Sequence, residues 1–158
     1  FMSEGDALQH TTKWVQEIAA DSDEISVNPM NIQKRTIVDR IFRHREYRPP
    51  WLWSLVQMIR NVHDDIHPEG KPSRSRLIVH PTAAGSVRGA HNCGRCDKEV
   101  AAAIERYSVS GSLLEFEGLS CECESQWKAE IELDTSLPIP LGSGIDRRLD
   151  PIEALLSP

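Results

Sequence analysis

Apolar residues recur every three or four positions in four stretches of the chain, which is the spacing of an amphipathic helix. These stretches predict helices over residues 3–20, from Asn28-Pro29 to near Tyr47, from Pro50 to Val62 and from Lys98 to Tyr107. Ser and Asn at the start of the first two are good helix caps, and Pro suits a first helical turn. The third helix is the most hydrophobic, so we expect it to lie centrally.

A period of two, which is typical of a half-buried strand, occurs twice after residue 110. Leu114 and Phe116 alternate with glutamates, and residues 127–133 alternate Trp, Ala, Ile and Leu with Lys and Glu. We expect these two runs to pair as a β-hairpin. Residues 77–80 (Leu-Ile-Val-His) form a third, shorter β-prone run. The predicted fold class is therefore α+β, a small N-terminal helical bundle followed by a module with a β-hairpin.

Breaks between these elements divide the chain into four predicted segments. Residues 1–68 form a helical module, and residues 69–90 form a basic linker rich in Pro, Ser and Gly. Residues 91–137 contain all four cysteines. Residues 138–158 are predicted to be a flexible tail with a short helix after Asp150-Pro151, which suits an ordinary terminus or a short motif for a protein partner.

The composition is that of a water-soluble chain, with 39% hydrophobic and 27% charged residues. No run of about 18 apolar residues occurs, so we expect no membrane span. The acidic first residues lack the basic-then-apolar order of a signal peptide. These features predict a cytoplasmic, reducing location.

Charge is distributed unevenly along the chain, although the net charge is −6. Residues 29–90 carry eleven Lys or Arg and five Asp or Glu, and the remainder carries seven basic and nineteen acidic groups. This basic middle suits nucleic acid or an acidic protein surface, or it pairs with the acidic ends. The candidate nucleic-acid contacts are Arg40, Arg43, Arg45, Arg48, Arg74 and Arg76.

The four cysteines form two close pairs, Cys93/Cys96 and Cys121/Cys123, separated by the 24 residues 97–120. Two pairs at short spacing with a long loop between them can present four thiolates to zinc. Four protein ligands leave no open coordination position, so we expect a structural zinc, with no catalytic residues at this site. Two disulfides between the pairs, a redox-active dithiol and a ligand set that includes His91 remain alternatives.

The stretch Cys93-Gly94-Arg95-Cys96 resembles a zinc knuckle, and Cys121-Glu122-Cys123 followed by Trp127 resembles the second knuckle of a zinc ribbon. The resemblance covers residues 88–134. It implies a zinc-ribbon-like module in which the second pair lies at the tip of a hairpin. One departure is that Cys-x-Cys is one residue shorter than the usual second pair. The whole layout also resembles that of small phage or viral accessory proteins.

A rival chemistry is possible at His63-Asp64-Asp65-Ile66-His67. Two histidines four apart on a helix can hold a metal, and His63-Asp64 resembles the paired signature of HD-type phosphohydrolases. A polar helix end with no chemical role is the simpler reading, because histidine suits the C-terminal end of the helix dipole.

The function predicted from sequence is a non-enzymatic, zinc-stabilised interaction protein of regulatory or viral-accessory type. Its basic middle would contact nucleic acid or an acidic protein surface. The alternatives are a protein–protein adaptor without nucleic-acid contact and a metal-dependent hydrolase that uses His63, Asp64 and His67.

Overall fold

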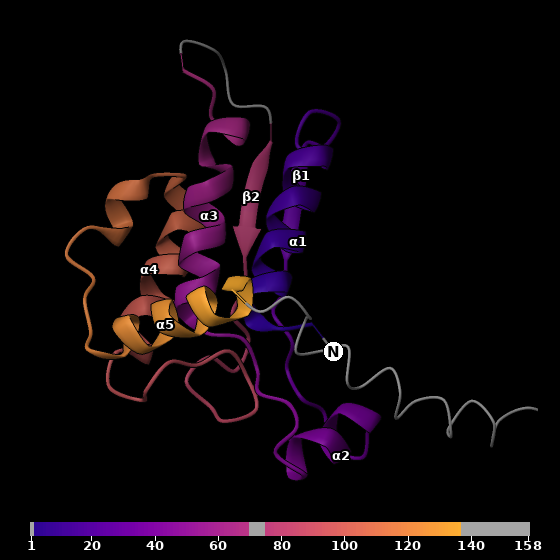
Figure 1. Cartoon of the computed structure of the whole chain (residues 1–158). Helices are drawn as coiled ribbons and strands as arrows, with labels where there is room; N and C mark the ends of the chain where they lie inside the picture. The colour runs from indigo at the N-terminus through magenta and orange to yellow at the C-terminus, as the bar shows by residue number, and fades with distance from the viewer. Residues whose placement is uncertain (1, 70–74, 137–158) are drawn as a thin grey trace, which may run out of the picture.

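The computed structural model describes residues 2–69 and 75–136, which contain five α-helices, one 3-10 helix and two strands (Figure 1). In chain order the elements are α1 (Glu4–Ile18), β1 (Glu24–Val27), α2 (Ile37–Arg43), α3 (Leu52–Ile66), β2 (Arg76–Val79), α4 (Asp97–Ser110), the 3-10 helix η1 (Leu113–Phe116) and α5 (Cys123–Ser136). The predicted α+β class is confirmed. No helix in these ranges is long and apolar enough to cross a membrane.

The two strands form a parallel pair, with Glu24 opposite Arg76 and Val27 opposite Val79. The chain leaves β1, passes through α2 and α3, and returns to the sheet as β2. Strand β2 was expected at nearly this position. Strand β1 was not predicted, because its four residues contain only two apolar side chains, Ile25 and Val27.

Helices α1 and α3 pack side by side at the centre of the molecule (Figure 1). As predicted, Ser3 caps α1, and its hydroxyl accepts a hydrogen bond from the Asp6 N–H. Helix α3 continues past the predicted end at Val62 to Ile66, because the apolar stripe continues and Ile66 is fully buried. Its position in the core confirms that the most hydrophobic stretch is central.

Helix α2 is shorter than predicted and lies apart from the other helices, at the lower end of Figure 1. It begins at Ile37, where the Thr36 hydroxyl accepts from the Asp39 N–H, and not at Asn28. Residues 28–36 are not helical. They are held to the rest of the protein by Ile32, whose N–H donates to the Arg88 carbonyl and whose side chain is buried. The expected three-helix bundle is therefore a packed pair, α1 and α3, with α2 outside it.

The predicted β-hairpin is wrong. Its first run is the 3-10 helix η1, and its second run lies inside α5. The buried face of α5 contains Cys123 and Trp127 and continues to Ile131, which is helical spacing. Ala129 and Leu133, which completed the apparent alternation, are exposed. The Ala, Glu, Lys and Gln residues of this segment all favour a helix.

One hydrophobic core joins residues from both of the predicted modules. It runs from Val15 of α1 through α3 and the strands to Trp127 of α5. The boundary predicted near residues 69–90 thus separates segments of sequence whose apolar side chains pack together. Part of the predicted linker (70–74) and the predicted tail (138–158) lie outside the described residues.

Candidate metal centre and basic surface

Each cysteine pair lies at the start of a helix. Cys96 is the residue before α4, and Cys123 is the first residue of α5. The Sγ atoms of Cys93 and Cys121 are 3.6 Å apart, as are those of Cys96 and Cys123, and all four lie within 4.8 Å of one another. The structure therefore brings together the four cysteines that the sequence indicated, on two helix ends instead of a hairpin tip.

The sulfur arrangement fits a tetrahedral metal ion. Zinc–sulfur bonds of about 2.3 Å place tetrahedral sulfurs about 3.8 Å apart, close to the 3.6 Å between Sγ atoms in the cluster. All four thiols are free, so the structure does not contain the alternative disulfides. The ring of His91 lies against the Gly89 carbonyl, 2.8 Å away, and is not part of the cluster.

Two buried N–H groups point at sulfur atoms from outside the cluster. The Asn92 amide nitrogen donates to Cys96 Sγ, and the Trp53 indole nitrogen donates to Cys123 Sγ, both at 3.3 Å. Such donors favour a thiolate over a thiol, and they fix the direction of the sulfur lone pairs. Neither residue was predicted to belong to the site, although Asn92 directly precedes the first cysteine.

The four thiols are not equivalent, because two are buried and two reach the surface. The backbone N–H of Arg95 lowers the pKa of Cys93 to about 6, so this exposed thiol ionises readily. Burial raises the pKa of Cys96 to about 12, and burial also raises that of Cys123. A cation at the centre supplies the positive charge that a buried pair of thiolates requires.

The loop that carries the first pair is ordered by one buried carboxylate. Asp97 accepts hydrogen bonds from the backbone N–H groups of Asn92 (2.8 Å) and Gly94 (2.6 Å). Gly94 has a φ of +88°, a conformation that residues with a Cβ rarely adopt. The tight turn at Gly94 follows from these contacts, and it sets Cys93 and Cys96 on the same side of the loop.

Arg48, one of the predicted nucleic-acid contacts, also contacts this loop. Its guanidinium donates to the His91 carbonyl (2.7 Å) and lies over the ring of Trp51, 3.9 Å from the centroid. The Trp51 indole in turn donates to Glu130 of α5. Arg48 therefore links the start of α3 to the loop that carries the first cysteine pair, and its side chain is half-buried.

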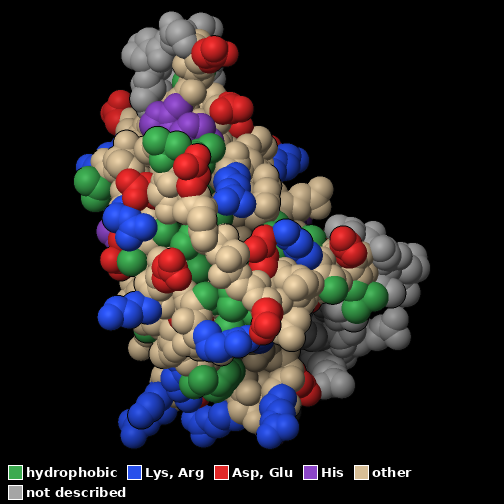
Figure 2. All heavy atoms as spheres, turned by 90° about the vertical axis from the view of Figure 1, so that its left-hand side faces the viewer, with side chains coloured by type: hydrophobic (Ala, Val, Ile, Leu, Met, Phe, Trp, Pro, Cys, Tyr) green, Lys and Arg blue, Asp and Glu red, His purple; other side chains and the backbone are tan. Residues whose placement is uncertain are grey.

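Four exposed arginines surround α2 and define what we term the α2 arginine surface: Arg35, Arg40, Arg43 and Arg45. Figure 2 shows Lys and Arg side chains gathered at the lower end of the molecule, where α2 lies in Figure 1. Arg35 and Arg45 have positive φ values of 68° and 60°. These backbone conformations turn the chain at the two ends of α2.

The carboxylate of Asp39 lies beneath this surface and is completely buried. Arg43 and Arg88 pair with its carboxylate, the latter at 2.7 Å, and the Arg35 backbone N–H donates to it at 2.9 Å. Arg43, the Arg35 N–H and Arg88 hold the pKa of Asp39 well below its usual range. One carboxylate cannot neutralise the whole cluster, so the surface keeps a net positive charge.

The remaining predicted contacts are dispersed. Arg76 is on β2, where it lies 3.9 Å from Glu24 and donates weakly to the Ser108 carbonyl. Arg74 lies outside the described residues. Of the five members that the structure describes, Arg40, Arg43 and Arg45 lie together at α2, Arg48 lines a pocket beside Arg43 and Arg45, and Arg76 lies apart on β2.

The histidine pair of the rival hypothesis forms no metal cluster among the described residues. The two rings pack against each other with centroids 4.8 Å apart, and His63 Nδ1 lies 3.3 Å from the Tyr107 hydroxyl. Burial and the neighbouring His63 lower the pKa of His67. The pair is part of the packing between α3 and α4.

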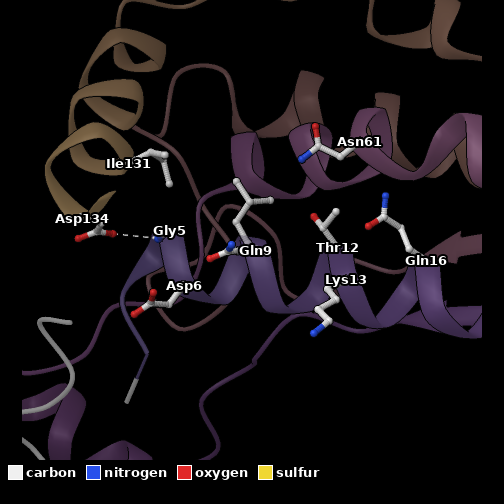
Figure 3. Close-up of a pocket in the computed structure, with 10 residues that line it drawn as sticks. Gly5, Asp6, Gln9, Thr12, Lys13, Gln16, Asn61, Ile131 and Asp134 are labelled. Carbon is white, nitrogen blue, oxygen red and sulfur yellow. Dashed lines mark hydrogen bonds between the residues drawn. The ribbon is translucent and has the colours of Figure 1, made fainter. Parts of the chain in front are cut away.

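A polar pocket lies between α1, α3 and α5 (Figure 3). Its labelled side chains include amides and hydroxyls, and at one end Asp134 of α5 accepts a hydrogen bond from the Gly5 N–H at 2.9 Å. That contact satisfies a backbone donor in the first turn of α1. The pocket contains no nucleophile paired with a base, so it does not indicate catalysis.

The fold and the site together define an α+β protein with a cluster of four cysteines whose spacing fits a metal ion. No family model matches the sequence, and no solved structure matches it. Curated proteins do. The chain is 35% identical over 134 residues to the archaeosine synthase subunit beta of Methanosarcina acetivorans, and 34% identical over 133 residues to the protein of the same name in Thermococcus kodakarensis. It is 29% identical over 147 residues to an uncharacterized protein of Methanocaldococcus jannaschii.

These matches cover 84–90% of this chain but only 37–39% of the relatives. The chain thus spans less than half the length of the proteins that it resembles. The comparisons also correct the function predicted from sequence. All three relatives are archaeal, and two are named as subunits of an enzyme, so the interpretation as a regulatory or viral-accessory protein is wrong.

Proposed function

We propose that this chain serves in the formation of archaeosine, a modified nucleoside of archaeal tRNA, as part of a protein of the archaeosine synthase beta type. The observation that carries the proposal is the identity of 34–35% to two such subunits over 84–85% of the chain. The name "subunit" describes the relatives as members of an assembly, and we extend that property to this chain. Its protein partner would be another subunit.

Within such a protein, the four-cysteine cluster would hold a structural zinc. Four thiolates complete a tetrahedral shell and leave no position for water or substrate. The cluster also joins segments that are remote in sequence, since Trp53 of α3 and the starts of α4 and α5 all meet at it. A metal there stabilises the packing of three helices, and the reaction would take place elsewhere in the protein.

The α2 arginine surface would contact the phosphates of tRNA. Arginine binds phosphate with paired N–H donors and remains charged at every physiological pH. The surface is exposed, and its buried anchor Asp39 holds Arg43 in place through an ion pair. Such contacts position an RNA without reading its bases.

Disrupting the gene in the source organism tests the proposal. We expect tRNA from the disrupted strain to lose archaeosine when its nucleosides are measured by mass spectrometry. Restoring the gene should restore the nucleoside, and restoring it with Cys96→Ser and Cys123→Ser together should not. Unchanged archaeosine in the disrupted strain would refute the proposed function.

A further inference from the structure

The two-stranded sheet is closed on one edge and open on the other. At the outer edge of β2, the Ser108 hydroxyl of α4 accepts from the Val79 N–H (2.9 Å) and is within 3.1 Å of the Val79 carbonyl. A side chain thus occupies the place of a neighbouring strand. Within the described residues the sheet has only two strands, so the outer edge of β1 has no such partner strand.

The hydrogen-bond register shows which groups face the open edge. The Arg76 N–H donates to the Asp23 carbonyl, and the His80 N–H donates to the Val27 carbonyl. Backbone groups alternate sides along a strand, so the N–H and C=O groups of Glu24 and Ser26 point away from β2. Both residues are exposed. They form a short template for a further strand.

On the open side of the sheet there is one helix, α1, that no strand precedes among the described residues. Helix α3 lies between β1 and β2 in sequence and packs on β2, while α4 covers the far side of β2. Helix α1 packs against α3 and immediately precedes β1. In a sheet of parallel strands, a helix before a strand crosses over from the preceding parallel strand. Helix α1 occupies that place, but the strand before it is missing from the described residues.

An apolar groove follows the open edge. It is lined by one stripe of α1 and by residues 25–30, and it includes Trp14, Ile18 and Met30. The side chains of these three residues are 60%, 46% and 45% exposed. A parallel sheet is normally covered on both faces, and a pair of strands is marginal alone. The groove and the free edge are therefore adjacent surfaces that one strand can cover at once.

We propose that the open edge of β1 receives a parallel β-strand with apolar side chains at alternate positions, supplied by a segment of the same polypeptide outside residues 1–158. The strand would bond to the backbone of Glu24 and Ser26 and cover Trp14 and Ile18. Its source rests on the proposed function, because the beta-type relatives are more than twice as long as their match to this chain. A second copy related by a two-fold axis would place β1 antiparallel to itself, which the position of α1 does not suit.

Photo-cross-linking in the source organism tests this placement in the native protein. A photoreactive phenylalanine analogue at Ser26 should cross-link to a segment of the same polypeptide, identified by mass spectrometry. The matched control places the analogue at Val109, which is 81% exposed on α4 and should give no such link. A link from Ser26 to a second copy or to another protein would overturn the proposal, as would the absence of any link.

Hydrogen exchange provides an independent readout. In the native protein, the amides of Glu24 and Ser26 should exchange at least about tenfold more slowly than in the isolated 158-residue chain. Ser26→Pro removes the outward N–H and should abolish this protection, whereas Ser26→Thr should retain it. Equal exchange in the two proteins would refute strand addition, and it would leave the archaeosine measurement unaffected.

Discussion

The indole N–H of Trp53, in the middle of the molecule, donates a hydrogen bond of 3.3 Å to the sulfur of Cys123, seventy positions later in the chain. Trp53 belongs to the first turn of α3, and Cys123 begins α5. The contact therefore connects the hydrophobic core directly to the metal-binding cluster. It implies that metal affinity and fold stability depend on each other.

Trp53→Phe should weaken metal binding by at least about tenfold, because outer-shell donors orient ligands and stabilise the thiolate. The phenyl ring fills much of the same buried space but has no N–H to donate. Competition with a chromogenic zinc chelator measures the affinity. Trp127→Phe is the matched control, since the Trp127 indole is equally buried but donates to the Ser54 hydroxyl. Equal loss of affinity in both variants would contradict a specific role for the Trp53 N–H.

Asp39→Asn should destabilise the protein at neutral pH and much less in acid. Arg43, the Arg35 N–H and Arg88 lower the pKa of this carboxyl in the folded state. Its contribution is therefore fully present above the unfolded pKa of about 3.9, and it is lost as the pH falls through the folded value. Denaturant unfolding from pH 3 to 8 should show a constant difference between wild type and variant above about pH 5, which narrows below pH 4. A difference that does not depend on pH would contradict the ion-pair account.

Charge reversal on the α2 arginine surface should weaken binding to tRNA. Arg40→Glu and Arg45→Glu together should reduce affinity at low salt and make the dependence of log Kd on log salt shallower, because fewer counterions are released. Filter binding across a salt series measures both quantities. Lys13→Glu and Lys98→Glu together, an equal change of charge at exposed positions on α1 and α4, are the control and should have little effect. Equal weakening by the control would indicate a general effect of net charge.

The sequence predicts the cysteine cluster better than it predicts the elements that carry it. Cysteine spacing alone indicates a cluster, because few other arrangements place two close thiol pairs in one domain. The hairpin prediction failed at α5, where Trp127 and Ile131 fit periods of two and four equally well. Only the exposure of Ala129 and Leu133 distinguishes the helical spacing from the strand spacing.

The predicted arginines do not all lie on one surface, for a physical reason. Charge counting treats every arginine alike, but Arg48 is held by the His91 carbonyl and the Trp51 ring, and Arg76 lies on a strand. Such long-range contacts join residues that no local pattern connects. Strand β1 was missed because its four residues contain only two apolar side chains and its partner lies some fifty residues away across α2 and α3.

Metal analysis of the purified native protein tests the central claim most directly. We expect one zinc ion per chain by inductively coupled plasma mass spectrometry, and we expect Cys96→Ser or Cys123→Ser to lose both the zinc and the cooperative unfolding transition. Ser125→Ala, an exposed change in the first turn of α5, should retain both. A chain that folds cooperatively without metal, or one that contains iron with visible absorbance in place of zinc, would contradict the account.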